Sequence, residues 1–276
     1  MRFHTIFLVL ILFSGNLFSQ SNSYYDWIDR SALYVERNDL DSAAYSLRQA
    51  MKLEPANEKN KLLLLNLGVL QRQMRLMDDA YISFTAALNN NPDPALVLHN
   101  RASLLCDLGR YDEAMKDYDE IISTEPDDVE AYYRRGLLYL ENNRREEAEA
   151  DFLRSEEIDA DNLFTKLSRA LLFKLDDNWE EAEKVYTDII NGEDRVLSTY
   201  YLNRAECYVN TERFGKAAAD LRIAEREQRD NPYFYILRGR LRLDQYDKFA
   251  AREDFQKAKE LGYDDELADK WISRTK

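Results

Sequence analysis

Glycine and proline are scarce in this sequence, which has 8 glycines and 5 prolines among 276 residues. A protein built from many β-strands needs these residues at its frequent turns, so a mostly helical chain is expected. Basic side chains are also in the minority, because 38 lysines and arginines face 52 aspartates and glutamates and leave a formal net charge of −14. Binding to a phosphate backbone requires clustered lysine and arginine, so this balance argues against a nucleic-acid partner.

The N-terminus holds a short hydrophobic run, residues 6–13, after a weakly positive start. A polar break at Ser14 ends the run, which is far shorter than the roughly 20 apolar residues that cross a bilayer. This layout predicts a signal peptide over residues 1–20, cleaved after Ser19 or Gln20, and hence an exported protein that is periplasmic or extracellular. The alternative is an uncleaved anchor, and only then would the protein contact a membrane.

Histidines are scarce, and the common sequence motifs of enzyme active sites are missing. Of the 2 histidines, His4 lies in the predicted signal peptide, so the mature chain keeps only His99 and has no multi-histidine metal site. The glycines are scattered singly, which excludes a glycine-rich phosphate loop, and there is no Gly-x-Ser-x-Gly elbow or calcium loop. Adjacent carboxylates such as Glu146 and Glu147 fit a helix start better than an acid–base pair. We expect no enzyme, no cofactor, no metal site and no small-molecule substrate.

An internal repeat runs through the rest of the chain. Small residues recur at intervals of 34 to 37 residues, at Ser31, Gly68, Ala102, Gly136, Ala170, Ala205 and Gly239. An alanine follows each of them after twelve residues, at Ala43, Ala80, Ala114, Ala148, Ala182, Ala217 and Ala251. A bulky apolar residue comes four positions later, at Leu47, Phe84, Tyr118, Phe152, Tyr186, Leu221 and Phe255. Self-similarity at a fixed period indicates a repeat architecture.

Each repeat has the periodicity of two amphipathic helices. The small residue on the first helix and the alanine on the second let the two backbones approach closely, and the bulky residue fills the seam beside them. Prolines stand where second helices should end, because proline cannot continue a helix: Pro55, Pro92, Pro126 and Pro232. One pair cannot bury its own hydrophobic face, so neighbouring pairs must stack into a solenoid.

These residues resemble the tetratricopeptide repeat family. The repeat at 95–128 matches the family pattern well, at Leu98, Ala102, Leu105, Tyr111, Ala114, Tyr118 and Pro126. The resemblance implies an all-α fold, an α-solenoid of about seven helix-turn-helix repeats at residues 24–57, 61–94, 95–128, 129–162, 163–196, 198–231 and 232–263. Residues 264–276 resemble the C-terminal capping helix of such arrays, which buries the exposed edge of the last repeat. An independent functional tail is the alternative.

Arginine recurs at the seventh position of the first helix, where the family often has leucine. These arginines are Arg30, Arg101, Arg135, Arg169, Arg204 and Arg238. In four of these repeats the second helix carries an aspartate at the same distance after the arginine: Asp117, Asp151, Asp220 and Asp254. Arginine binds a carboxylate with two parallel hydrogen bonds, so we predict architectural ion pairs within a repeat or between neighbours. An anion-binding ladder is the alternative. Cys106 and Cys207 fall three repeats apart, too far for a disulfide, and should be free thiols.

The resemblance also implies a binding surface, because the first helices of such arrays line the concave side through their second, fifth, sixth, ninth, twelfth and thirteenth positions. We call this the first-helix rule. The residues that would face the concave side include Asn66, His99, Asn100, Ser103, Glu130, Tyr133, Arg134, Phe164, Ser168, Asn203, Glu206 and Arg240. The candidate protein- or peptide-binding residues are Asn66, His99, Asn100, Tyr133, Arg134, Phe164, Ser168 and Asn203. Four of these share the sixth position and should form a polar row: Asn100, Arg134, Ser168 and Asn203. Such a row suits an extended peptide, and a solvated, unused face is the alternative.

The family's carboxylate clamp, which holds a chaperone's C-terminus, is not present, because Leu65, Val69 and Glu130 stand where lysine, asparagine and lysine are needed. The sequence therefore predicts an exported, non-enzymatic scaffold that binds a protein or peptide partner in its concave groove. The alternatives are a structural subunit of a larger cell-envelope assembly, which would use convex or edge surfaces, and an accessory module of a separate catalytic chain.

Overall fold

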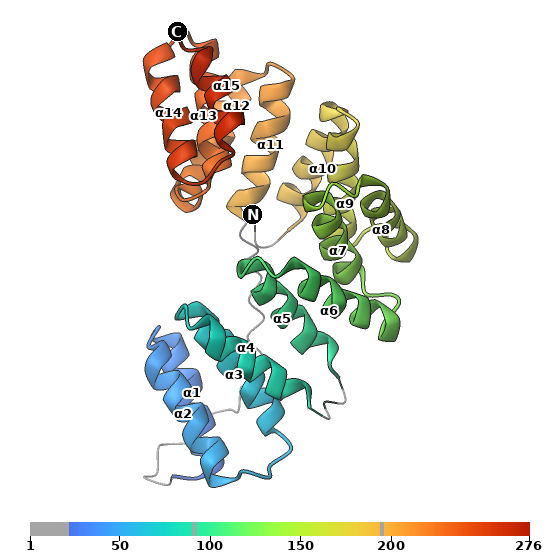
Figure 1. Ribbon diagram of the computed structural model, residues 1–276, viewed down its shortest axis with the longest axis vertical. Coiled ribbons are helices and arrows are strands. Elements are labelled where there is room, and N and C mark those ends of the chain that lie inside the picture. Colours follow the sequence, from blue (N-terminus) through green and yellow to red (C-terminus); the bar gives the residue numbers. More distant parts are fainter. Residues whose placement is uncertain (1–21, 90, 92, 194–195) are drawn as a thin grey trace. The chain divides into compact units, whose positions relative to one another are not determined.

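The computed structural model describes residues 22–89, 91, 93–193 and 196–276, so the predicted signal peptide lies outside the described residues. The described residues form fifteen α-helices and no strands, which confirms the all-α prediction (Figure 1). The first seven helices are α1 (Tyr24–Glu36), α2 (Leu40–Leu53), α3 (Asn60–Gln73), α4 (Met77–Leu88), α5 (Ala95–Asp107), α6 (Tyr111–Thr124) and α7 (Val129–Glu141). The others are α8 (Arg145–Ile158), α9 (Leu163–Leu175), α10 (Trp179–Gly192), α11 (Ser198–Asn210), α12 (Phe214–Gln228), α13 (Pro232–Asp244), α14 (Lys248–Glu260) and α15 (Asp265–Ser273).

The chain divides inside α7 into two compact halves, an N-terminal half that ends at Leu138 and a C-terminal half that begins at Tyr139. In the N-terminal half α1 packs on α2, α3 on α4 and α5 on α6. In the C-terminal half α9 packs on α10, α11 on α12 and α13 on α14. Second helices also pack on the first helix of the following pair: α2 on α3 and α4 on α5 in the N-terminal half, and α8 on α9, α10 on α11 and α12 on α13 in the C-terminal half. None of the described helices is long and apolar enough to span a bilayer.

Left-handed residues turn the chain between the two helices of a pair. One residue has a positive φ in each of seven such turns: Asn38, Arg75, Gly109, Asn143, Asp177, Glu212 and Tyr246. A left-handed residue closes a helix C-terminus because it directs its N–H back to the last carbonyl groups, as Tyr246 does to Leu243 O at 3.0 Å. The next helix then starts directly, and Asp247 caps it by accepting a hydrogen bond from Ala250 N.

The repeated alanines lie in the core, as predicted. All seven are fully buried: Ala43, Ala80, Ala114, Ala148, Ala182, Ala217 and Ala251. The bulky residues four positions later are buried too, from Phe84 and Phe255 at 0% exposure to Leu47 and Leu221 at 3%. Because these positions recur once per repeat, the same alanine-and-seam packing builds the core of each helix pair that lies within one half.

Glycine stands on the first helix where the seam residue is phenylalanine. A Cβ atom on Gly68 would lie 2.5 Å from Cε1 of Phe84, and one on Gly239 would lie 2.5 Å from Cε1 of Phe255. Two non-bonded carbons prefer about 3.5–4.0 Å, so neither site has room for a methyl group. Where the first helix carries alanine, the seam residue is tyrosine or leucine instead, in the combinations Ala102 with Tyr118, Ala170 with Tyr186, and Ala205 with Leu221.

This fit predicts that Gly68→Ala lowers the free energy of unfolding by about 2 kcal/mol through overpacking, although alanine favours a helix. Adding Phe84→Leu should remove most of that cost, because the double variant reproduces the combination of Ala205 with Leu221. Urea unfolding of the two single variants and the double variant, followed by circular dichroism, measures the coupling, which we expect to be about 1 kcal/mol or more. Additive costs would contradict the steric explanation.

Three of the predicted arginine–aspartate pairs form, and each lies within one helix pair. They are Arg101 with Asp117, Arg204 with Asp220, and Arg238 with Asp254, joined by hydrogen bonds of 2.6 to 3.2 Å. In each pair two guanidinium nitrogens donate to one carboxylate, which is the strong, oriented form of the interaction. The fourth pair, Arg135 with Asp151, would join residues of different halves and stays a prediction.

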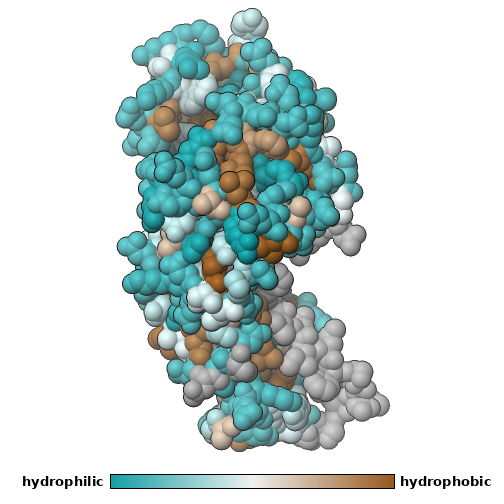
Figure 2. All heavy atoms as spheres, turned by 90° about the vertical axis from the view of Figure 1, so that its right-hand side faces the viewer, coloured by the Kyte–Doolittle hydropathy of each residue, from teal (hydrophilic) through white to brown (hydrophobic). Residues whose placement is uncertain are grey.

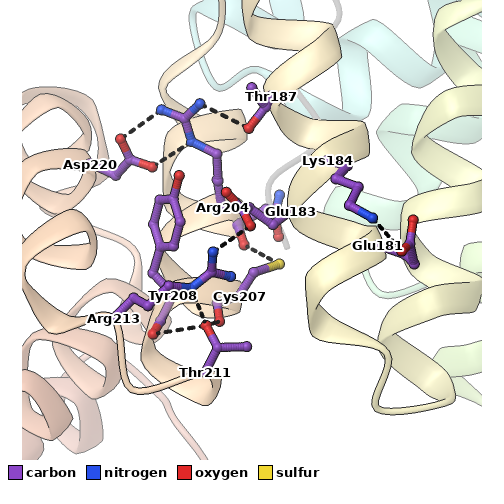
Figure 3. A network of polar contacts seen from close by, with 11 residues as sticks. Glu181, Glu183, Lys184, Thr187, Arg204, Cys207, Tyr208, Thr211, Arg213 and Asp220 are labelled. Atoms are coloured by element: carbon purple, nitrogen blue, oxygen red, sulfur yellow. Dashed lines mark hydrogen bonds and ion pairs between the residues drawn. The ribbon is translucent and has the colours of Figure 1, made fainter.

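The same guanidinium groups also reach the preceding second helix. Arg204 Nη1 donates to Thr187 Oγ1 of α10 at 3.2 Å while the group binds Asp220 of α12 (Figure 3). In the next pair, Arg238 Nη1 lies 2.9 Å from Glu225 Oε1 of α12. Each of these two arginines therefore holds its own helix pair together and also joins it to the preceding helix pair. These contacts confirm the predicted architectural ion pairs, both within a helix pair and between neighbouring pairs.

The C-terminal segment forms the predicted capping helix. Asp264 caps α15 by accepting a hydrogen bond from Leu267 N at 2.8 Å. The ring of Trp271 stacks on Phe255 with centroids 5.6 Å apart, and Ala268 is fully buried. The helix thus covers the seam of the last repeat, which would otherwise be open to water.

Candidate functional site

First helices of successive pairs lie side by side within each half. In the N-terminal half α3 contacts α5, and in the C-terminal half α11 contacts α13. We call the surface that they share the first-helix face of each half. Its polar members in the N-terminal half are Arg72, His99, Asn100, Asp107, Glu130 and Arg134, together with Asp128 just before α7. In the C-terminal half they are Lys174, Asn203, Glu206, Asn210, Tyr233 and Arg240.

Arg72 links α3 to α5 on the N-terminal first-helix face. Its Nη2 atom donates to Ser103 Oγ at 2.9 Å and lies 2.7 Å from Asp107 Oδ2. The side chain is 9% exposed, so burial makes this pair costly to break. The twelfth position of a first helix carries this arginine, which the sequence interpretation had not included.

His99 links α5 to the start of α7. Its Nε2 atom lies 2.9 Å from Asp128 Oδ2, and Asp128 Oδ1 also accepts a hydrogen bond from Ala131 N. Burial raises the pKa of Asp128, but the hydrogen bond and charge of His99 and the backbone N–H groups outweigh it and hold that pKa below its usual value. Asp128 therefore stays ionised and caps α7 while it orients the imidazole ring.

Two members of the predicted polar row use their hydrogen bonds inside their own helix. Asn100 is 5% exposed and donates to Leu96 O at 2.8 Å, and Ser168 is fully buried and donates to Phe164 O at 2.9 Å. Arg134 is also buried and lies 2.6 Å from Glu130 Oε1 one turn earlier. Partner binding by these residues stays a prediction.

The other predicted residues are partly exposed and belong to both halves. Asn66, His99 and Tyr133 lie in the N-terminal half, and Phe164 and Asn203 lie in the C-terminal half. Asn203 joins a neighbouring helix, since Lys174 Nζ donates to its Oδ1 atom at 3.4 Å. The eight candidates are therefore divided between two bodies.

A polar chain links three first helices in the C-terminal half. Lys174 of α9 forms an ion pair with Glu206 of α11 at 2.5 Å, and Tyr233 of α13 donates to the other oxygen of Glu206 at 2.6 Å. Burial, with the charge of Glu206, raises the pKa of Tyr233 well above its usual value, so the phenol remains a donor. Lys174 occupies the twelfth position of its first helix and Tyr233 the second position of its own. Both positions belong to the first-helix rule, which also selected Glu206.

The two cysteines are free thiols, as predicted. Burial raises the pKa of Cys207 to about 12, so its thiolate is not populated at neutral pH. The described part of the chain also brings no three His, Cys, Asp or Glu side chains together in a way that could hold a metal ion.

Most of one side of the protein is covered by polar side chains (Figure 2). Hydrophilic side chains predominate on the side drawn in Figure 2, and hydrophobic ones show between them in separate groups. Some large apolar side chains on second helices are exposed, including Leu153 at 56% and Ile223 at 53%. Substitutions of these exposed second-helix residues can therefore serve as controls for substitutions on the first-helix faces.

Sequence profiles of known families match the middle of the chain. A profile described as TPR repeat matches residues 102–143, and one described as tetratricopeptide repeat matches residues 129–162. No curated protein sequence matches the chain.

Solved structures extend the similarity over most of the chain. The crystal structure of a tetratricopeptide repeat protein from Parabacteroides merdae is 35% identical, has a TM-score of 0.68, and its match covers 92% of this chain and 99% of that one. One chain in the crystal structure of the APC/C hetero-tetramer Cut9–Hcn1 shares the fold at 10% identity and a TM-score of 0.66, and the match covers 86% of this chain and 52% of that one. The pilF protein of Pseudomonas aeruginosa matches at 19% identity and a TM-score of 0.57, over 76% of this chain and 94% of that one.

Proposed function

Because the chain belongs to the tetratricopeptide repeat family, we propose that it is an exported, non-enzymatic scaffold that binds a protein partner on its first-helix faces. The polar chain from Lys174 through Glu206 to Tyr233 carries the proposal, because it fixes side chains of three successive first helices on one surface. A partner that binds such a preorganised surface does not have to order it, so the entropy cost of binding falls. The apolar run at residues 6–13 supports export.

Affinity capture from the cell-envelope fraction, followed by mass spectrometry, tests where the partner binds. Tyr133→Ala and Asn203→Ala change the first-helix face of one half each, whereas Leu153→Ser and Ile223→Ser change exposed second-helix residues. We expect at least one first-helix variant to lower partner recovery about tenfold, the effect of losing one good contact. Circular dichroism should show unchanged helicity in all four variants.

The opposite ranking would support the structural-subunit alternative, in which convex or edge surfaces make the contacts. Recovery that falls only in Leu153→Ser or Ile223→Ser would therefore overturn the proposed binding face. The intact mass of the exported protein tests export separately, because a retained Met1 would contradict cleavage of residues 1–20.

A further inference from the structure

Two arginines flank one tryptophan ring at the end of the C-terminal half. The guanidinium of Arg240 on α13 lies 5.2 Å from the Trp271 ring centroid, and that of Arg274, which follows α15, lies 4.4 Å from it. Stacking of Trp271 on Phe255 fixes the ring, so both cations are held on a rigid platform.

Arg240 lacks the carboxylate partner that other first-helix arginines have. From α3 to α13, eight other arginines of the first helices each pair with a carboxylate: Arg72, Arg101, Arg134, Arg135, Arg169, Arg204, Arg238 and Arg242. Among the described residues, Arg240 forms one side-chain hydrogen bond, from Nη2 to Asn210 Oδ1 at 2.9 Å, and no ion pair. Its Nε and Nη1 groups therefore have no acceptor in the described part of the protein.

The acidic group whose charge acts on Arg240, Glu206, is already engaged. Glu206 binds Lys174 through one oxygen and Tyr233 through the other. Burial lowers the pKa of Arg240, and the positive charge of Arg274 lowers it further, while Tyr233 and Glu206 oppose this. Two cations thus lie close together with one shared ring and no anion of their own, in a chain whose formal net charge is −14.

We propose that Arg240 and Arg274 bind side-chain carboxylates of an acidic segment in the partner protein. The inference rests on the proposed function and names the chemistry of the partner at one place, where α13 meets the capping helix. Guanidinium N–H groups suit carboxylates because they can donate two parallel hydrogen bonds. Tyr233 and Tyr263 are partly buried residues near Arg240, so their neutral rings would border the bound segment.

The test is a fluorescence-anisotropy titration of the full mature chain with rhodamine-labelled peptides. The probe is a C-terminally amidated alternating Glu/Ser peptide, and the matched neutral probe is Gln/Ser. We expect the acidic probe alone to bind, and Arg240→Gln or Arg274→Gln to weaken it about tenfold each, the effect of one charge-assisted hydrogen bond. Added salt should weaken binding as well.

Lys184→Gln is the control variant, because Lys184 is an exposed cation on second helix α10 and is 67% exposed. Arg274 is itself exposed, so Arg274→Gln keeps the test valid if Arg240→Gln disturbs Trp271. Equal binding of both probes, or equal affinity in Arg274→Gln and Lys184→Gln, would overturn the inference. Tight binding of a Gln/Ser peptide with a free C-terminus would overturn it too, since the site would then recognise a terminal carboxylate.

Failure of this inference can be distinguished from failure of the proposed function. If Tyr133→Ala or Asn203→Ala loses the captured partner while Arg240→Gln and Arg274→Gln retain it, the first-helix face binds without these arginines and only the inference fails. If none of the four variants loses the partner, the binding face itself is wrong.

Discussion

Replacing Asp220 with alanine should lower the free energy of unfolding by about 3 kcal/mol, because it leaves Arg204 charged and without its carboxylate in a largely buried position. Asp220 is 5% exposed and Arg204 is 14% exposed, so water reaches neither group well enough to replace the bond. Urea unfolding followed by circular dichroism at 222 nm measures the loss. A second consequence is reduced cooperativity, since Arg204 also joins α11 to α10 through Thr187.

Glu181→Ala is the matched control, because Glu181 forms an exposed ion pair with Lys184 in the same half (Figure 3). Such pairs contribute about 0–1 kcal/mol, so its unfolding midpoint should hardly move. The double variant Arg204→Leu with Asp220→Ala should regain part of the stability, since no unpaired charge remains. Leu67 already occupies the equivalent position of α3. Similar losses in Asp220→Ala and Glu181→Ala would contradict the architectural role of the pair.

Trp271→Ala should lower the free energy of unfolding by about 3 kcal/mol, because the substitution removes a large aromatic side chain from a partly buried seam. The ring covers Phe255, and its removal would expose the cluster that Phe255 forms with Ile236 and Ala258. Deletion of residues 264–276 should have at least the same effect and promote aggregation. Thermal unfolding with light scattering measures both outcomes.

Trp271→Phe and Lys270→Ala are the controls for this prediction. Phenylalanine keeps a ring on Phe255 and should restore most of the stability, whereas Lys270 is 64% exposed and its loss should cost little. An unchanged midpoint after deletion of residues 264–276 would show that the segment is an independent tail rather than a cap.

The sequence predicted which residues lie on the first helices, but not the contacts that their side chains make. The first-helix rule selected Asn203, Glu206 and Arg240, which do lie on the first-helix face. It could not show that Asn100 and Ser168 would bond to carbonyl groups of their own helices, because a short polar side chain has a local acceptor one turn earlier. Nor could it show that Lys174 would reach Glu206, since that depends on how α9 and α11 pack.

Sequence alone determined the helix pairs, the buried alanines, the seam residues and the arginine–aspartate pairs. These features depend on spacing within one helix or one pair, and the 3.6-residue period converts spacing directly into a shared face. Only the tertiary structure decided which of the other charges have partners, and that Arg240 lies beside Trp271 without an ion pair among the described residues. That outcome depends on contacts between elements far apart in the chain, where a distance of a few ångströms separates an ion pair from an unpaired charge.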